Sequence, residues 1–256
     1  MTVTWHWNAS TVLGAAMFLG IYLWLIGPVR RRLRTAPATP AQVASFGAAL
    51  AILLVALNGP LHDLSEQYLF SAHMVQHLLL VLAVPPLILM GTPGWIVDRV
   101  TRRAPVHRLS AWLTGPLVAF FLPNFVLGLW HFPAPYDAAL ANHRLHVTMH
   151  LSLMVSAGML WWPVVSPTPA LPRLGYAGQM LYLFSLGLPM SLIGALITLA
   201  ERPIYRWYVN APRLFPGLTP LEDQRLGGLI MWVPGMLVFW GAMTIVWFRW
   251  AAKEAD

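Results

Sequence analysis

Two pairs of histidines at helical spacing are the residues of this sequence best suited to chemistry. His73 and His77 lie four residues apart, as do His146 and His150. Residues four apart on a helix share a face one turn apart, so each pair presents two imidazoles in one direction. Two facing pairs would offer up to four nitrogen ligands to one cation, a set suited to copper or zinc. The sequence therefore predicts a metal site at these four histidines.

Each pair also has a purely structural interpretation. A single HxxxH on an apolar helix is commonly a pair of hydrogen-bonded histidines near the membrane interface. Ionisable groups inside membrane helices are costly and usually functional, which favours a metal site when two pairs lie at the same depth. The chain has no cysteine. Thiolate sites are therefore excluded, and any metal must be held by His, Met or carboxylate.

Other residues near the pairs are weaker candidates for the same site. They are His62, Asp63, Met74, His131, His143, Met149 and Asp223. The two methionines would be soft ligands for cuprous copper, but methionine is more commonly packing material. His143 would extend the stripe of the second pair if that helix begins early enough.

The remaining polar candidates leave alternatives open. His62, Asp63 and Glu66 precede the third apolar run and form either an auxiliary ligand set or a solvated loop of mixed charge. His131 follows Trp130 and is either a ligand or part of an aromatic belt at the membrane surface. We expect Asp223, with its neighbour Gln224, to hydrogen-bond metal-bound imidazoles.

The composition places all these residues in a membrane protein. The chain is 58% hydrophobic and 10% charged, whereas soluble domains have a charged share of about 25%. A spanning helix needs about 20 apolar residues, so 256 residues allow roughly eight spans and little else. We expect one all-α transmembrane domain over residues 1–256. The seven predicted spans are 11–29, 41–57, 69–90, 111–130, 147–165, 178–199 and 226–248.

The distribution of basic residues predicts the orientation of the chain in a bacterial inner membrane. If the first span exits into the cytoplasm at its arginine cluster, eleven Lys and Arg lie inside and five lie outside, as the positive-inside rule requires. The inner set is Arg30, Arg31, Arg32, Arg34, Arg99, Arg102, Arg103, Arg108, Arg173, Arg249 and Lys253. The N-terminus is then periplasmic, the C-terminus is cytoplasmic, and all histidines except His107 lie toward the periplasm.

The inner halves of the spans exclude some function classes. Residues 78–90, 151–162 and 231–248 contain no ionisable side chain, whereas a cation transporter needs partners along its whole path. The net charge of +7 follows from the inner arginines, so it indicates contact with lipid and not with nucleic acid. We expect a site that is open on one side only.

Short motifs in one order give the chain a specific resemblance. They are HMVQHLLL at 73–80, PPL at 85–87, GTP at 91–93, WHFP at 130–133, the pair His146 and His150, WWP at 161–163, DQ at 223–224, GG at 227–228 and MWVPG at 231–235. In this combination the sequence resembles the CtaG-type cytochrome c oxidase assembly factors. The resemblance implies a seven-helix membrane protein that is needed to make active haem-copper oxidase, with copper delivery as its expected role.

The sequence thus predicts an assembly factor, not an enzyme, that holds copper at the histidine cluster and passes it to haem-copper oxidase subunits. Two alternatives stay open. A b-type cytochrome would clamp one haem between histidines of two helices, and a zinc-dependent membrane enzyme would use a nearby carboxylate as general base. The sequence predicts no oligomeric state.

Overall fold

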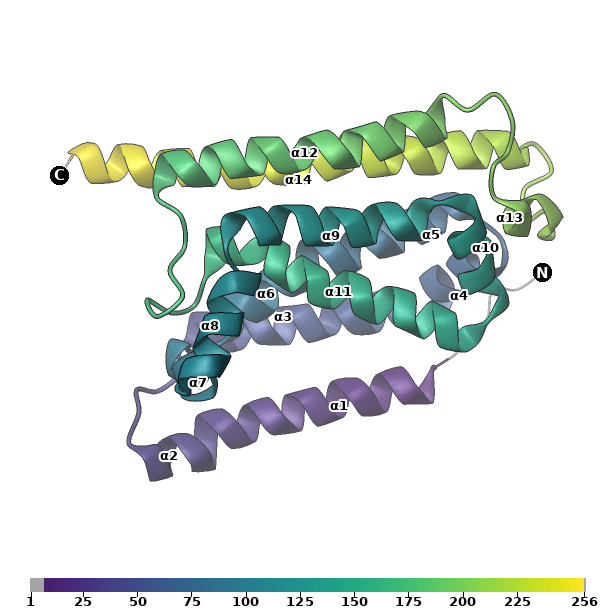
Figure 1. Cartoon of the computed structure of the whole chain (residues 1–256). Coiled ribbons are helices and arrows are strands. Elements are labelled where there is room, and N and C mark those ends of the chain that lie inside the picture. The colour runs from purple at the N-terminus through teal and green to yellow at the C-terminus, as the bar shows by residue number, and fades with distance from the viewer. Residues whose placement is uncertain (1–6, 256) are drawn as a thin grey trace.

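The computed structural model describes residues 7–255 and is built of helices joined by short loops (Figure 1). No strand occurs among these residues. The longer helices are α1 (Ala9–Trp24), α3 (Pro40–Leu57), α9 (Pro116–His131), α11 (His143–Val165), α12 (Tyr176–Thr198) and α14 (Pro220–Ala255). The shorter ones are α2 (Arg30–Leu33), α4 (Gly59–Gln67), α5 (Phe70–Leu78), α6 (Val84–Gly91), α7 (Gly94–Val100), α8 (Ala104–Leu113), α10 (Pro133–Ala141) and α13 (Arg206–Asn210). Two π-helical turns cover Leu25–Val29 and Leu79–Ala83.

The predicted spans are largely confirmed as helices. Within residues 7–255, six helical stretches are long and apolar enough to cross a membrane, and a seventh arises if α8 and α9 form one bent span. The first stretch continues through a π turn from Ala9 to Leu33, and the third runs from Phe70 to Gly91. The last helix is longer than the predicted 226–248, because a capping box of Thr219 and Glu222 starts it at Pro220.

The predicted fourth span at 111–130 corresponds to a bent pair of helices. α8 ends at Leu113, α9 begins at Pro116, and the two are bent by 65°. Gly115 is extended and Pro116 occupies the first turn of α9, where its missing N–H costs nothing. α9 alone has 16 residues, or about 24 Å, so a full span of about 30 Å requires residues of α8 as well.

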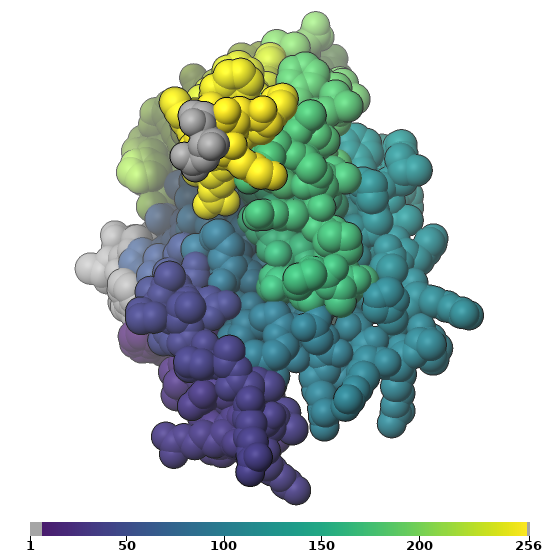
Figure 2. All heavy atoms as spheres, turned by 90° about the vertical axis from the view of Figure 1, so that its left-hand side faces the viewer, coloured from purple at the N-terminus to yellow at the C-terminus, as the bar shows by residue number. Residues whose placement is uncertain are grey.

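The two ends of the helical bundle differ in composition. α4, α10 and α13 lie at one end, which we call the histidine end, and α2, α7 and α8 lie at the opposite, arginine end (Figure 1). Figure 2 looks onto the arginine end, where α2, the segment of α7 and α8, the loop before α12 and the last turns of α14 form the surface. All eleven basic residues predicted to be cytoplasmic lie in these segments or, as Arg34 does, directly after one of them. The structure therefore groups them at one end, as the orientation prediction requires.

The third span is broken at the level of its two prolines. Pro85 has no N–H to donate to the carbonyl of Val81. The indole Nε1 of Trp161 on α11 donates to that carbonyl instead, at 3.1 Å. A freed backbone carbonyl in a membrane helix needs such a partner, so this bond also ties α11 to the helix that carries His73 and His77.

The paired glycines of α14 allow three helices to meet. A Cβ atom on Gly228 would lie 2.8 Å from the backbone nitrogen of Thr198 on α12, and one on Gly227 would collide with the ring of Phe70 on α5. Only residues without a side chain permit this approach. The Gly227–Gly228 motif thus packs α14 against α12 and α5 together.

Candidate metal centre

Five of the histidines that the structure describes are buried and lie together at the histidine end. They are His73 and His77 on α5, His131 at the end of α9, and His146 and His150 on α11, each between 0 and 7% exposed. The ring centroids of His73 and His146 are 5.7 Å apart, those of His77 and His150 are 5.4 Å apart, and those of His77 and His131 are 5.8 Å apart. The four predicted ligands and one weaker candidate are therefore brought into one cluster, which we call the histidine cluster.

Three imidazoles of the histidine cluster converge closely enough to share one ion. Each of His73, His146 and His150 offers one nitrogen, and these nitrogens all lie within 4.8 Å of one another. His77 adjoins this set, since its Nε2 is 2.7 Å from the Nε2 of His73. Three imidazoles with a fourth next to them suit copper or zinc, with a coordination position left open.

The hydrogen bonds of His73 orient it toward the cluster. Its Nδ1 lies 2.9 Å from the hydroxyl of Tyr208, and that hydroxyl donates its own proton to the carbonyl of Ser65 at 2.5 Å. The hydroxyl can therefore only accept from His73, which places the imidazole proton on Nδ1. The Nε2 atom is left with a lone pair that faces the other histidines.

The same logic assigns the tautomers of His131 and His146. The Nδ1 of His131 donates to the carbonyl of Leu127 at 2.7 Å, and the Nδ1 of His146 donates to Glu66 Oε1 at 2.9 Å. Carbonyl and carboxylate oxygens only accept, so the Nε2 atom of each ring carries the lone pair.

Several of these nitrogens are buried without a hydrogen-bond partner among residues 7–255. They are Nδ1 of His77 and Nε2 of His131, His146 and His150. Buried polar side-chain atoms are nearly always satisfied, and each exception requires an explanation such as an ion. Four unpartnered nitrogens in one cluster fit a cation that the imidazoles would surround.

Glu66 lies beside the cluster on α4 and contacts two histidines. Its Oε1 is 2.9 Å from His146 and 3.2 Å from His62. Burial alone would raise the pKa of Glu66, but the hydrogen bond from His146 and the charges of the neighbouring imidazoles hold it below its ordinary value. Burial lowers the pKa of His62, although Glu66 and Asp63 act in the opposite direction. Glu66 is thus an ionised carboxylate that orients a candidate ligand, as carboxylates next to metal-bound histidines do.

The predicted loop before the third span is a helix in the structure. His62, Asp63 and Glu66 belong to α4, which the sequence pattern did not predict. The amide of Gln76 on α5 donates to the carbonyl of Ala56 at 2.7 Å and lies 3.2 Å from Nδ1 of His62. α4 is therefore anchored to α5, and His62 lies next to the cluster and not in open solvent.

Three buried tyrosines are a feature of the site that the sequence analysis missed. Tyr136, Tyr205 and Tyr208 are at most 2% exposed and come from α10 and the start of α13. The hydroxyl of Tyr205 donates to the carbonyl of His131 at 2.9 Å. Burial raises the pKa of Tyr208 well above its ordinary value, so its phenol stays protonated and can donate. The spacing of Tyr205 and Tyr208, three residues apart in a polar loop, was the one available signal.

The other weaker candidates lie outside the converging set. Met74 and Met149 are fully buried members of the hydrophobic core. His143 is exposed at the first turn of α11. His107 lies at the arginine end, 3.2 Å from the carbonyl of Ala170. His6 falls outside the described residues.

Asp223 has a different role from the predicted contact with imidazoles. Both of its carboxylate oxygens accept from the start of α5, from the N–H of Phe70 at 2.7 Å, from the N–H of Ser71 at 3.2 Å and from the Ser71 hydroxyl at 2.5 Å. It therefore caps the helix that carries His73. Gln224 likewise binds backbone, accepting from Ile204 at 2.7 Å.

Comparison with known proteins assigns a family to this arrangement. A family model described as cytochrome c oxidase caa3 assembly factor (Caa3_CtaG) matches residues 20–253. An uncharacterized protein of Mycobacterium bovis is 27% identical over 208 residues, which is 73% of this chain and 30% of that protein. An uncharacterized protein of Mycobacterium leprae is 25% identical over 268 residues, which is 97% of this chain and 40% of that protein. The chain thus spans less than half the length of these curated relatives, and no solved structure matches it. Since the family model covers nearly the whole chain, including every member of the histidine cluster, the chain belongs to the cytochrome c oxidase caa3 assembly factor family.

Proposed function

We propose that this protein binds a copper ion with His73, His146 and His150 and passes it to a subunit of a haem-copper oxidase during assembly. The observation that carries the proposal is the convergence of three imidazole nitrogens within 4.8 Å. Two of those rings, His146 and His150, have a buried Nε2 without a partner in the described chain. Membership of an oxidase assembly family supplies the acceptor.

The surroundings of the cluster favour binding that is firm but reversible. Imidazole is a good ligand for copper in both oxidation states, and it exchanges more readily than a closed cage of thiolates. His77 lies next to His73, and His131 lies next to His77. A departing or arriving ion would therefore find an alternative nitrogen on either side.

The geometry favours copper over the haem alternative. Imidazole rings and the ring of Tyr136 occupy the space between α5 and α11, with His73 and Tyr136 centroids 5.2 Å apart. A porphyrin clamped between two histidines would require these rings to separate. The proposal includes a bacterial inner membrane with the histidine end facing the periplasm, because the arginine end then meets the positive-inside rule.

Metal analysis of the purified full chain tests the proposal. After loading with cuprous ion and removal of excess metal, we expect about one copper per chain, and His150→Ala should lose most of it. His143→Ala is the matched control, because it removes an exposed histidine of the same helix. Equal copper in both variants, or a Soret absorbance in the purified protein, would overturn the copper assignment.

The assembly role needs a separate measurement in cells. A strain carrying His150→Ala should contain the protein at normal level but lose much of its cytochrome oxidase activity, whereas His143→Ala should retain it. Added copper should partly restore the first strain if the defect is one of affinity. Full oxidase activity with His150→Ala would contradict the delivery role.

A further inference from the structure

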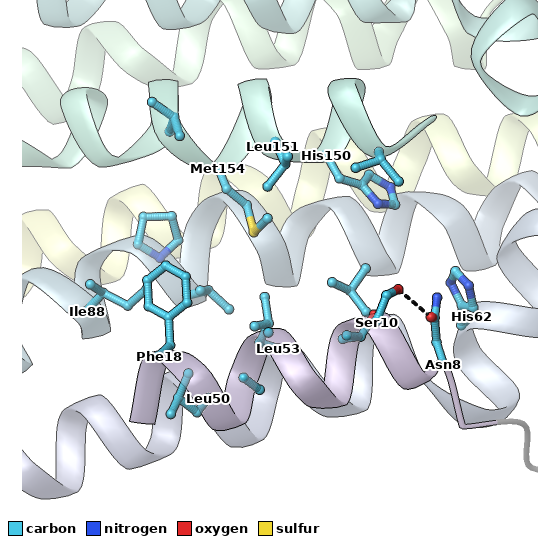
Figure 3. A pocket seen from close by; sticks show the side chains of 18 of the residues that line it. Asn8, Ser10, Phe18, Leu50, Leu53, His62, Ile88, His150, Leu151 and Met154 are labelled. Atoms are coloured by element: carbon cyan, nitrogen blue, oxygen red, sulfur yellow. Dashed lines mark hydrogen bonds between the residues drawn. The ribbon is translucent and has the colours of Figure 1, made fainter. Parts of the chain in front are cut away.

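A pocket of about 510 Å³ lies between α1, α3, α6 and α11, next to the histidine cluster. Its walls are nearly all apolar, with Phe18, Leu53, Ile88 and Met154 among the lining side chains. Figure 3 shows the polar residues Asn8, Ser10, His62 and His150 at one end of this pocket and Phe18 and Ile88 at the other. The pocket is therefore elongated and polar at the histidine end only.

The pocket exists because α1 is held mainly at the end away from the histidines. There the ring of Tyr22 stacks on that of Phe46 with centroids 3.8 Å apart, and its hydroxyl donates to the carbonyl of Gly91 at 3.0 Å. At the histidine end, the N–H of Asn8 donates to the side chain of Asn58 at 2.7 Å. Between these contacts, α1 presents Leu13 and Met17 to the surroundings, 69% and 59% exposed. The pocket itself is open to the surroundings, since Phe18 and Val155 in its lining are 54% and 62% exposed.

The size of the pocket suits a small ligand. From Asn8 to Phe18, the pocket runs beside ten residues of α1, or about 15 Å. A cavity of 300–1,000 Å³ with apolar walls and a few polar groups is typical of a site for a small ligand.

The polar end offers hydrogen-bond donors to the headgroup of a ligand. Among the described residues, α1 begins at Ala9 with no side-chain cap and no acidic residue in its first turn, and the positive end of its dipole lies at the rim. The imidazole of His143 and the side chain of Thr11 line the same end. Glu66 is the acidic lining residue, and its carboxylate is engaged by His62 and His146.

We propose that the pocket binds one glycerophospholipid, with an acyl chain along α1 and the phosphate at the rim formed by Asn8, Thr11 and His143. The bilayer supplies such a chain directly, and a tightly packed protein does not leave an apolar volume of this size empty. His146 and His150 also line the pocket. The bound lipid therefore covers the side of the histidine cluster that faces the pocket.

Photo-crosslinking of the full chain tests the orientation of the lipid. The probe is a phosphatidylglycerol with a diazirine at the end of one acyl chain, and a second probe carries the diazirine beside the headgroup. We expect the chain-end probe to label peptides that contain Phe18, Ile88 or Met154, and the headgroup probe to label those with Asn8 or His143. Uniform labelling of lipid-facing helices, including α12, would overturn the proposal.

Glycine variants test the volume of the pocket. Gly14 and Gly158 line the pocket, and a Cβ atom at either position would meet open space. The double variant Gly14→Leu, Gly158→Leu should therefore fill the pocket without a backbone clash. Gly47→Leu with Gly128→Leu is the matched control, since both residues also have open space but lie outside the pocket. We expect at least a tenfold loss of chain-end labelling in the first variant and none in the control.

Extraction of lipid from protein purified in detergent identifies the natural ligand. About one phospholipid per chain should remain with the unmodified protein and with the control variant, but not with the filled variant. Recovery of an isoprenoid in its place, or equal labelling of both variants, would overturn the phospholipid assignment. These readouts involve no metal, so they are independent of the proposed copper site.

Discussion

His146 Nδ1 lies 2.9 Å from Glu66 Oε1, and this contact joins a candidate ligand on α11 to an ionised carboxylate on α4. Because the carboxylate can only accept, it fixes the proton on Nδ1 and leaves Nε2 free to bind an ion. The same carboxylate holds His62 at 3.2 Å. Glu66 therefore connects the partly exposed His62 to the buried His146 of the histidine cluster.

Replacement of Glu66 should weaken copper binding without unfolding the protein. Glu66→Gln removes the charge that holds the His146 tautomer, and loss of such a carboxylate lowers metal affinity by about 10- to 100-fold. The measurement is competition for cuprous ion with a chromophoric chelator. Asp63→Asn is the control, because it removes a carboxylate from the same helix. Unchanged affinity in Glu66→Gln would show that His146 is oriented by other groups.

The converging histidines should behave as one unit. If His73 and His150 hold the same ion, each Ala substitution alone removes most of the copper binding. The double variant should then lose far less binding free energy than the sum of the two single losses, because one substitution has already destroyed the site. Bound copper per chain, by elemental analysis, is the readout for both single variants and the pair. Small and additive losses would instead indicate independent, hydrogen-bonded histidines.

Tyr208 should affect both the stability of the fold and the metal site. Tyr208→Phe removes the acceptor of the His73 Nδ1 proton and the donor to the carbonyl of Ser65, and buried groups left without partners cost about 1–3 kcal/mol. Tyr22→Phe is the control, because it removes a buried hydrogen bond to the carbonyl of Gly91, far from the histidine cluster. The temperature of thermal unfolding should fall in both variants, whereas copper affinity should fall only in Tyr208→Phe. A loss of stability with unchanged copper affinity would limit Tyr208 to a structural role.

Asp223 should stabilise the start of α5. Asp223→Ala removes three hydrogen bonds from Phe70 and Ser71, and the loss of a helix cap costs about 0.5–2 kcal/mol. Hydrogen exchange should accelerate at the amides of residues 70 and 71 more than elsewhere in α5. Glu222→Gln is the neighbouring control, because Glu222 is exposed and caps α14 itself. Equal exchange at the start of α5 in both variants would contradict the capping role.

A reporter fusion tests the orientation of the chain. A periplasm-active reporter fused after Glu201 should be active, and one fused after Arg103 should be inactive, because the arginines hold the second site in the cytoplasm. The reverse pattern would move the histidine cluster to the cytoplasmic side and exclude delivery of periplasmic copper.

Much of this protein could be predicted because lipid imposes simple rules on sequence. Apolar runs of membrane length, with prolines and arginines between them, predict six of the spans to within a few residues at most ends. The capping box of Thr219 and Glu222 depends only on neighbours in the chain, so the local order of residues is sufficient to encode it. The i, i+4 spacing of each histidine pair likewise predicts a shared face without knowledge of the fold.

The tertiary structure decided which of these faces meet. His131 joins the cluster, and Tyr208 binds His73 across 135 residues of sequence. Asp223 caps a helix that begins 153 residues before it. No local pattern encodes such contacts, because they depend on how α5, α11, α13 and α14 pack. Tertiary packing also determines the bend between α8 and α9, and it leaves the pocket between α1 and the other helices. Neither feature can be predicted from hydropathy, which indicates that a segment is apolar but not what it packs against.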